Sequence, residues 1–147
     1  MASDQAYVRA NHPARVYIYT YNRIVAGEQF KPVRWVGSSL KDVRLFPEAV
    51  RLDVGHALYS AQKGETDPCA KPLKGFGGSS VLEIAVRHDG DAWRAIYTVR
   101  FDDAIYVLHA FQKKSKSGIA TPKKEIDLMK QRLADAERDH RERQNRE

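Results

Sequence analysis

Residues 72–116, PLKGFGGSSVLEIAVRHDGDAWRAIYTVRFDDAIYVLHAFQKKSK, decide the fold of this chain. Three runs within them, 81–87, 93–101 and 105–111, are rich in β-branched and aromatic residues and are separated by short polar breaks. Such runs favour strands, and an Asp-Gly pair between two of them is a strong signal for a tight hairpin. The sequence therefore predicts an antiparallel meander of three strands.

The alternation of side chains predicts what each face of this meander carries, because successive residues of a strand point to opposite faces. In the first run Leu82 and the alternate apolar residues after it face one way, whereas Arg87 faces the other. In the second run Trp93 and Arg94 face opposite ways. One face is expected to be apolar and the other to carry arginines. The third run is apolar on both sides except at His109 and a tyrosine hydroxyl, which predicts a more central strand.

The residues before the meander predict one strand and two helices. Residues 32–37 indicate a short strand, and residues 40–46 indicate a short helix capped by Ser38 or Ser39. A longer helix is expected from Pro47 to Gly64, because its apolar residues recur at helical spacing. These residues are Val50, Val54, Ala57, Leu58 and Ala61. We expect this helical hairpin to cover one face of the sheet.

Two further segments flank the meander. Residues 65–78 carry glycines, prolines and Lys74, and indicate a loop that brings Lys74 close to the sheet. A last helix is predicted from Pro122 to about residue 142, with a narrow apolar stripe that docks on the domain. The end of this helix is fully polar, so we expect it to fray.

Composition limits the class of protein. The chain has 147 residues, of which 42% are hydrophobic and 30% charged, and no apolar run approaches the length of a membrane span. No signal peptide is recognisable, and the lone Cys69 excludes an internal disulfide. We therefore expect a cytoplasmic protein without membrane association. The net charge of +6 favours a polyanion or an acidic protein as partner.

The first 31 residues are the least informative part of the chain. We interpret residues 1–31 as an N-terminal extension and residues 32–147 as the domain proper. Tyrosines at positions 17, 19 and 21 alternate in a run with strand character. Two interpretations stay open: a partly ordered extension that adds a strand to the sheet edge, and a set of rings that stack on RNA bases.

The order of these elements resembles the RelE and HigB superfamily of type II toxins, and is most similar to its phage-derived, HigB-type branch. The resemblance covers about residues 32–135. Its matching segments are RWVGSSLKD at 34–42, FP at 46–47, KPLKG at 71–75, WRAIY at 93–97 and HAFQKKSK at 109–116. The fold class expected is α/β (α+β). It is a compact RelE-like domain in which the helical hairpin and the C-terminal helix pack on a mainly antiparallel, twisted sheet.

The resemblance also implies a function. Members of the superfamily enter the ribosomal A site, cleave messenger RNA and inhibit translation. They are silenced by a cognate antitoxin that commonly carries a helix-turn-helix domain. The expected partners are therefore this antitoxin, the ribosome and mRNA, with no small-molecule cofactor. Relatives of similar fold bind DNA gyrase instead, so a gyrase-binding toxin or a basic nucleic-acid-binding adaptor is the alternative.

Cleavage of RNA by its own 2′-hydroxyl needs a base, a proton donor for the leaving oxygen, and positive charge over the transition state. By resemblance, Arg87 is the transition-state arginine and Lys74 a base, while Lys113 and Lys114 are cationic residues of the active site. His109 has the pKa range for acid or base chemistry. We expect Arg94, Lys113 and Lys116 to bind RNA phosphates.

Each of these residues also has a purely structural interpretation. Arg87 and Arg94 are also compatible with solvated strand positions, and the lysines after residue 112 with a phosphate-binding patch that has no chemical role. A histidine in an apolar strand is often a hydrogen-bonded core residue. No carboxylate pair suggests a metal-dependent nuclease, so metal-free cleavage is expected.

Overall fold

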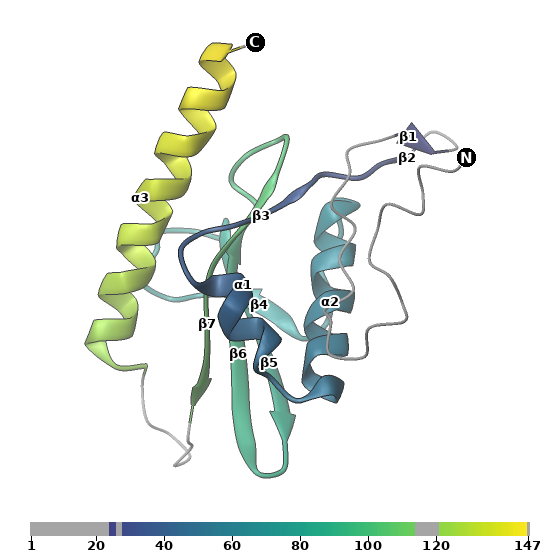
Figure 1. Ribbon diagram of the computed structural model, residues 1–147, viewed down its shortest axis with the longest axis vertical. Coiled ribbons are helices and arrows are strands. Elements are labelled where there is room, and N and C mark those ends of the chain that lie inside the picture. The colour runs from purple at the N-terminus through teal and green to yellow at the C-terminus, as the bar shows by residue number, and fades with distance from the viewer. Residues whose placement is uncertain (1–23, 26–27, 114–120, 147) are drawn as a thin grey trace.

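The computed structural model describes residues 24–25, 28–113 and 121–146 (Figure 1). The helices and strands, in chain order, are β1 (Ile24–Val25), β2 (Glu28–Gln29), β3 (Val33–Trp35), α1 (Ser39–Arg44), α2 (Glu48–Gln62), β4 (Ala70–Pro72), β5 (Val81–His88), β6 (Asp91–Thr98), β7 (Ile105–Lys113) and α3 (Lys123–Arg146). None of the helices in this part of the chain combines the length and the apolar character of a membrane span.

The meander is present as predicted, and it forms the centre of a five-stranded sheet. The strand order is β3-β7-β6-β5-β4, in which β3 pairs parallel to β7 and the other neighbours are antiparallel. The hairpin between β5 and β6 closes at His88 and Asp91. Its two central residues, Asp89 and Gly90, both have positive φ, at 51° and 84°. This is the backbone of the turn that matches the twist of a hairpin, and it explains the Asp-Gly pair.

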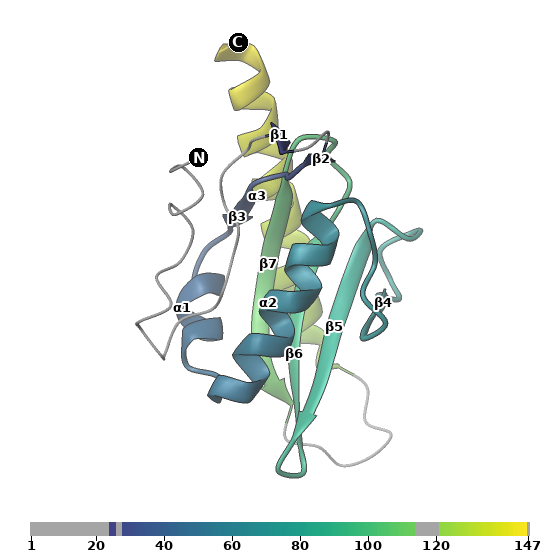
Figure 2. The same cartoon turned by 90° about the vertical axis from the view of Figure 1, so that its right-hand side faces the viewer.

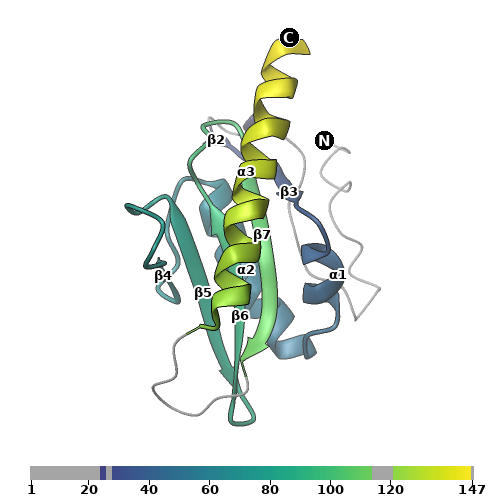
Figure 3. The ribbon, with the colours of Figure 1, turned by 90° about the vertical axis from the view of Figure 1, so that its left-hand side faces the viewer.

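Helices cover both faces of this sheet. Figures 2 and 3 show α1 and α2 on one face and α3 on the other. The apolar stripe predicted for α2 is fully buried against the first face, in a core with Leu82, Ile84 and Tyr97. On the second face Met129 and Ala136 of α3 pack with Ile96, Leu108 and Phe101. The α+β fold class is confirmed.

The strands differ from the prediction in one missed strand and in their bounds, above all at the end of β6. Part of the expected loop is strand β4, whose Ala70 is buried and pairs with Ile84. The prediction missed it because a three-residue strand ending in proline shows no alternation. Strand β6 ends at Thr98, whose hydroxyl donates to the carbonyl of Ser80 at 2.7 Å. Phe101 therefore leaves the sheet and joins the α3 core.

The N-terminal residues form a separate element. Strands β1 and β2 pair with each other in a two-stranded sheet that is not part of the five-stranded sheet. The expected strand with alternating tyrosines, at positions 17 to 21, lies outside the described residues. The boundary between the extension and the domain stays a prediction.

The start of α1 also departs from expectation. Ser38, one of the two candidates, is the N-cap residue, but its side chain makes no hydrogen bond to the helix backbone. The side chain of Ser39 is buried and donates to the carbonyl of Val107 at 3.1 Å. The hydroxyl of Ser38 instead donates to Asp42 at 2.8 Å. Both serines thus serve the junction between β3, α1 and β7.

The polar end of α3 is helical up to Arg146 and does not fray. Side chains from β7 and from the connection between β6 and β7 hold it in place. The Tyr106 hydroxyl donates to Asp139 at 2.7 Å, and Arg100 pairs with Glu137 at 2.6 Å. The amide of Gln144 donates to Asp103 at 3.0 Å. Polar partners on β7 and on the β6–β7 connection replace the apolar contacts that the last turns of the helix lack.

The first half of α3 is fixed to β7 through a buried histidine. His109, only 6% exposed, meets Glu125 through Nε2 at 3.2 Å and Arg132 through Nδ1 at 3.3 Å. An arginine only donates hydrogen bonds, so Nδ1 accepts and the ring proton lies on Nε2, which donates to the carboxylate. His109 is therefore neutral in this arrangement.

Burial lowers the pKa of His109 below its usual value of 6.5, and the charge of Arg132 acts in the same direction, against the opposing effect of Glu125. Because the folded pKa is depressed, the unfolded state binds the proton more tightly. The contribution of His109 to stability is present above the unfolded pKa and is lost as the pH falls below it.

We therefore predict that the free energy of unfolding rises with pH between about 5 and 7, the range around the usual histidine pKa. Replacement of His109 by Gln removes the histidine contribution to this rise. Urea unfolding of the two proteins across this pH range measures the effect. The matched control is His56→Gln, because His56 is exposed on α2. Equal loss of pH dependence in both variants contradicts the prediction.

Candidate nucleic-acid interface

Three of the predicted site residues lie on one face of the sheet, near its hairpin end. Arg87 of β5 pairs with Ala92 of β6, which in turn pairs with Lys113 of β7. Residues directly opposite in neighbouring strands point to the same face, and strands lie about 4.8 Å apart, so Arg87 and Lys113 are separated by roughly 10 Å at the backbone. Arg94 lies on this face too, because it pairs with Ala85 and Phe111.

A bulge in β7 creates this arrangement. Ile96 pairs with His109, but the next residue, Tyr97, pairs with Val107, so Leu108 is an extra residue. An extra residue reverses which face the following side chains occupy. Without the bulge Phe111 and Lys113 would lie on the α2 face with Val107. The bulge moves both to the face that carries Arg87 and Arg94.

We call the face defined by Arg87, Arg94, Phe111 and Lys113 the cationic face. Helix α3 covers the neighbouring part of the same side of the sheet, but its first turn reaches only to His109 through Glu125. Figure 3 shows the hairpin end of β5 and β6 projecting beyond the start of α3. Arg87 is exposed, and Arg94 and Lys113 are partly exposed. Charged strand residues thus line a surface that no described helix covers.

Arg94 is already paired within the protein. Its guanidinium donates to Glu83 across the β5–β6 pair, in a close contact between two partly buried side chains. Because this carboxylate neutralises part of its charge, Arg94 has less charge to offer a phosphate than exposed Arg87 has.

His109 lies beside the cationic face but is not open to solvent. Both of its ring nitrogens are engaged by α3, and its ring stacks on Phe111 with centroids 5.1 Å apart. This geometry favours the structural interpretation of His109 over acid or base chemistry. Its ring orients Phe111, which the sequence analysis did not assign to the site.

Lys74 and Arg87 are not brought together. The backbone N–H of Leu73 donates to Val81 at 2.9 Å, so Lys74 lies near the start of β5. Arg87 is six residues further along that strand, roughly 20 Å away at about 3.3 Å per residue. Lys114 and Lys116 lie outside the described residues.

The sequence analysis also missed Lys71. This exposed lysine pairs with Glu83 in register, so it lies on the same side of the sheet as Arg94. Its position was hidden because β4 itself was not recognised. The alternating pattern of β5 predicts which face each residue of β5 occupies, but it does not predict which residues of other strands lie beside them.

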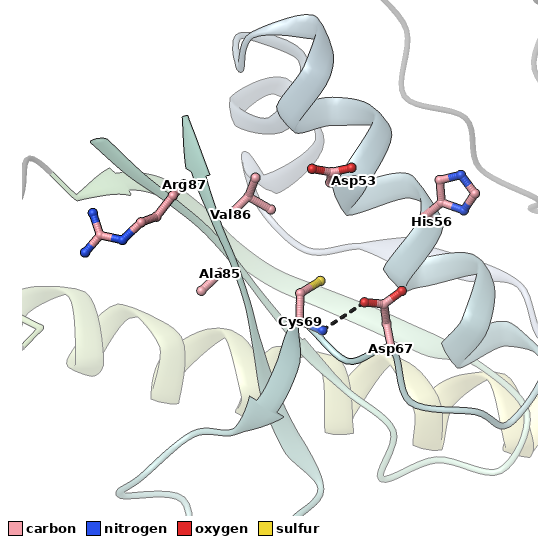
Figure 4. Close-up of a pocket in the computed structure, with 7 residues that line it drawn as sticks. All are labelled: Asp53, His56, Asp67, Cys69, Ala85, Val86 and Arg87. Atoms are coloured by element: carbon pink, nitrogen blue, oxygen red, sulfur yellow. Dashed lines mark hydrogen bonds between the residues drawn. The ribbon is translucent and has the colours of Figure 1, made fainter. Parts of the chain in front are cut away.

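A pocket of about 440 Å³ lies on the opposite side of β5, between α2 and β4. Figure 4 shows Asp53, His56, Asp67 and Cys69 around it, whereas the guanidinium of Arg87 points away. Burial, with the nearby Asp67, raises the pKa of Cys69 to about 12. The thiol therefore stays protonated at neutral pH and is a poor nucleophile. Within the described ranges, no group of three or more His, Cys, Asp or Glu residues is arranged to hold a metal ion.

Comparison with known proteins places the chain in a family. No curated protein matches it significantly. Among solved structures, the toxin-antitoxin complex RelBE2 from Mycobacterium tuberculosis is similar with a TM-score of 0.40 and 14% sequence identity, over 65% of this chain and 100% of that one. The family model "Phage derived protein Gp49-like" matches residues 41–134, which include most of α1, all of α2 and the meander, and half of α3. The chain therefore belongs to the family of phage-derived Gp49-like proteins.

Proposed function

We propose that this chain is the toxin of a type II toxin-antitoxin pair and that it cleaves mRNA on the ribosome. Family membership supports the toxin part of this proposal. The cationic face supports the RNA part, because Arg87 and Lys113 are held on one exposed surface with no described helix above them. Backbone contacts to RNA need charge at phosphate spacing and no base-specific partner.

Arg87 is the residue to which we assign the chief chemical role. When the 2′-hydroxyl of the RNA attacks the adjacent phosphate, negative charge accumulates on the phosphate oxygens. A guanidinium stabilises this charge with two parallel hydrogen bonds. Lys113, across Ala92, is proposed to hold a neighbouring phosphate. Phe111 beside them offers a ring on which a base can stack.

Proton transfer is assigned less directly. Lys74 lies far from Arg87, and both nitrogens of His109 are engaged. We therefore propose that Arg87 and Lys113 act through charge, and that Lys114, which lies outside the described residues, is the remaining candidate for a proton-transferring lysine.

The proposed partner is an antitoxin with a helix-turn-helix domain, encoded by an adjacent gene. A cytoplasmic location follows from this proposal, since ribosomes and mRNA are its targets. An antitoxin partner is also expected if the chain is a gyrase-binding toxin without nuclease activity.

The alternative is a binder without nuclease activity, acting on DNA gyrase or as a basic adaptor. One observation favours it: the predicted proton-transferring residues Lys74 and His109 do not converge on Arg87. A protein that only binds needs the cationic face but not a complete acid-base pair.

Primer extension on a reporter mRNA distinguishes these functions. With translating ribosomes, the purified protein is expected to generate new 5′ ends in the mRNA, and without ribosomes none. The Arg87→Ala variant should reduce cleavage by roughly 100-fold or more, the usual effect of removing a donor to a developing oxyanion. The control is Arg141→Ala, which removes an exposed guanidinium from the far end of α3.

Intact mRNA in the presence of ribosomes contradicts the nuclease proposal, and a gyrase supercoiling assay then tests the alternative. Equal cleavage by Arg87→Ala and the wild-type protein leaves the nuclease but removes Arg87 from its mechanism.

The salt dependence of RNA binding tests which lysines and arginines touch the phosphates. We expect Arg87→Ala and Lys113→Ala each to lower the slope of log affinity against log salt by about 0.7, the value for one phosphate contact to a single strand. Fluorescence anisotropy with a labelled single-stranded RNA measures this slope. Lys74→Ala should leave the slope unchanged, because Lys74 lies at the other end of β5. A loss with Lys74→Ala that equals the loss with Arg87→Ala contradicts the proposed interface.

A further inference from the structure

Leu45, in the turn after α1, presents an apolar side chain to solvent on a rigid support. It is 76% exposed. The turn is fixed by backbone hydrogen bonds from Leu45 to Asp42 at 3.1 Å and from Phe46 to Val43 at 3.0 Å. The buried guanidinium of Arg51 also stabilises the turn, because it donates hydrogen bonds to the backbone carbonyls of Phe46 and Arg44. Leu45 is thus held outward by a fixed turn.

A groove of about 330 Å³ adjoins this leucine, between the end of α1 and β7. Most of its lining is apolar. Phe46 and Trp93 pack edge to face with centroids 5.0 Å apart, and Phe111 and Ala110 of β7 complete the apolar part. We call this site, together with Leu45, the Leu45 groove. A single exposed leucine is common on protein surfaces, whereas a leucine beside an aromatic-lined hollow is typical of an interaction site.

Two exposed cations of α1, outside the lining itself, flank the Leu45 groove. Lys41 and Arg44 are exposed on α1, and Lys41 shares the face of Leu45 because it lies four residues before it. The one carboxylate of the lining, Asp42, accepts a hydrogen bond from Ser38. A second copy of this chain would bring the same cations to the contact, so an acidic partner fits better.

We propose that the Leu45 groove docks an acidic segment of a protein partner, which inserts an apolar side chain beside Leu45 and sets carboxylates against Lys41 and Arg44. The chemistry of the groove does not depend on RNA cleavage. We take the partner to be the antitoxin, and this identification rests on the proposed function.

The Leu45 groove borders the cationic face. Phe111 lines the groove and also lies opposite Arg94 on the cationic face. A segment bound in the groove therefore lies at the border of the proposed RNA surface. We expect it to hinder the approach of RNA to Phe111 without contacting Arg87.

Selection of a random phage-displayed peptide library on the full chain tests this proposal. The enriched peptides should combine Asp or Glu with an aromatic or aliphatic residue. In fluorescence anisotropy, Leu45→Asp should weaken binding of such a peptide at least 10-fold, as expected when an anchor residue is lost. The double variant Lys41→Glu, Arg44→Glu should weaken it and reduce its salt dependence. The control is Leu52→Asp, on α2, which is 38% exposed and should change the affinity less than 2-fold.

Enrichment of peptides that bind Leu45→Asp as well as the wild-type protein overturns the proposal. So does the absence of acidic-apolar peptides from the selection. Cleavage by Leu45→Asp and Leu52→Asp is expected to equal that of the wild-type protein, because neither residue is on the cationic face. A failed peptide test therefore leaves the RNA experiments unaffected.

Discussion

The guanidinium of Arg132 joins the three parts of the chain on which the rest of the structure depends. It donates to the Leu108 carbonyl at 3.0 Å and to Ser38 at 3.0 Å, and it contacts His109. Its Nε would lie 2.8 Å from a Cβ placed at Gly37, whose φ is +57°. A side chain at this position would strain the backbone and would force the guanidinium of Arg132 to move. One side chain of α3 thus fixes the β3–α1 connection and the bulged part of β7 at once.

This junction decides which surface stays open. It sets α3 over the half of the sheet that begins at His109, and leaves the hairpin half exposed (Figure 3). The β7 bulge then places Phe111 and Lys113 on the open half with Arg87. The other face is filled by α1 and α2, whose apolar stripe is buried. A cationic surface and an apolar core therefore occupy opposite sides of the same strands.

The sequence predicted those features that depend on local periodicity. The stripe of α2, the alternation of β5 and the Asp-Gly turn each follow from residues close together in the chain. The sequence did not predict the hydrogen-bond partners of His109. Glu125 and Arg132 lie on α3, and the rotation of this helix about its axis is set only by its packing on the sheet. The remoteness of Lys74 from Arg87 was hidden for a similar reason, since a loop prediction carries no register. The bulge at Leu108 has no sequence signature here, yet it decides which face Lys113 occupies.

The central claim is that RNA meets the protein on the cationic face, and amide chemical shifts measure this directly. The full chain is titrated with a short RNA that carries a 2′-deoxy nucleotide at the cleavage position, so that binding occurs without reaction. We predict that the largest shifts occur at Arg87, Ala92, Arg94, Phe111 and Lys113, with little change around Cys69 and Asp53. Shifts concentrated around Cys69 and Asp53, with the hairpin end unchanged, would contradict this account.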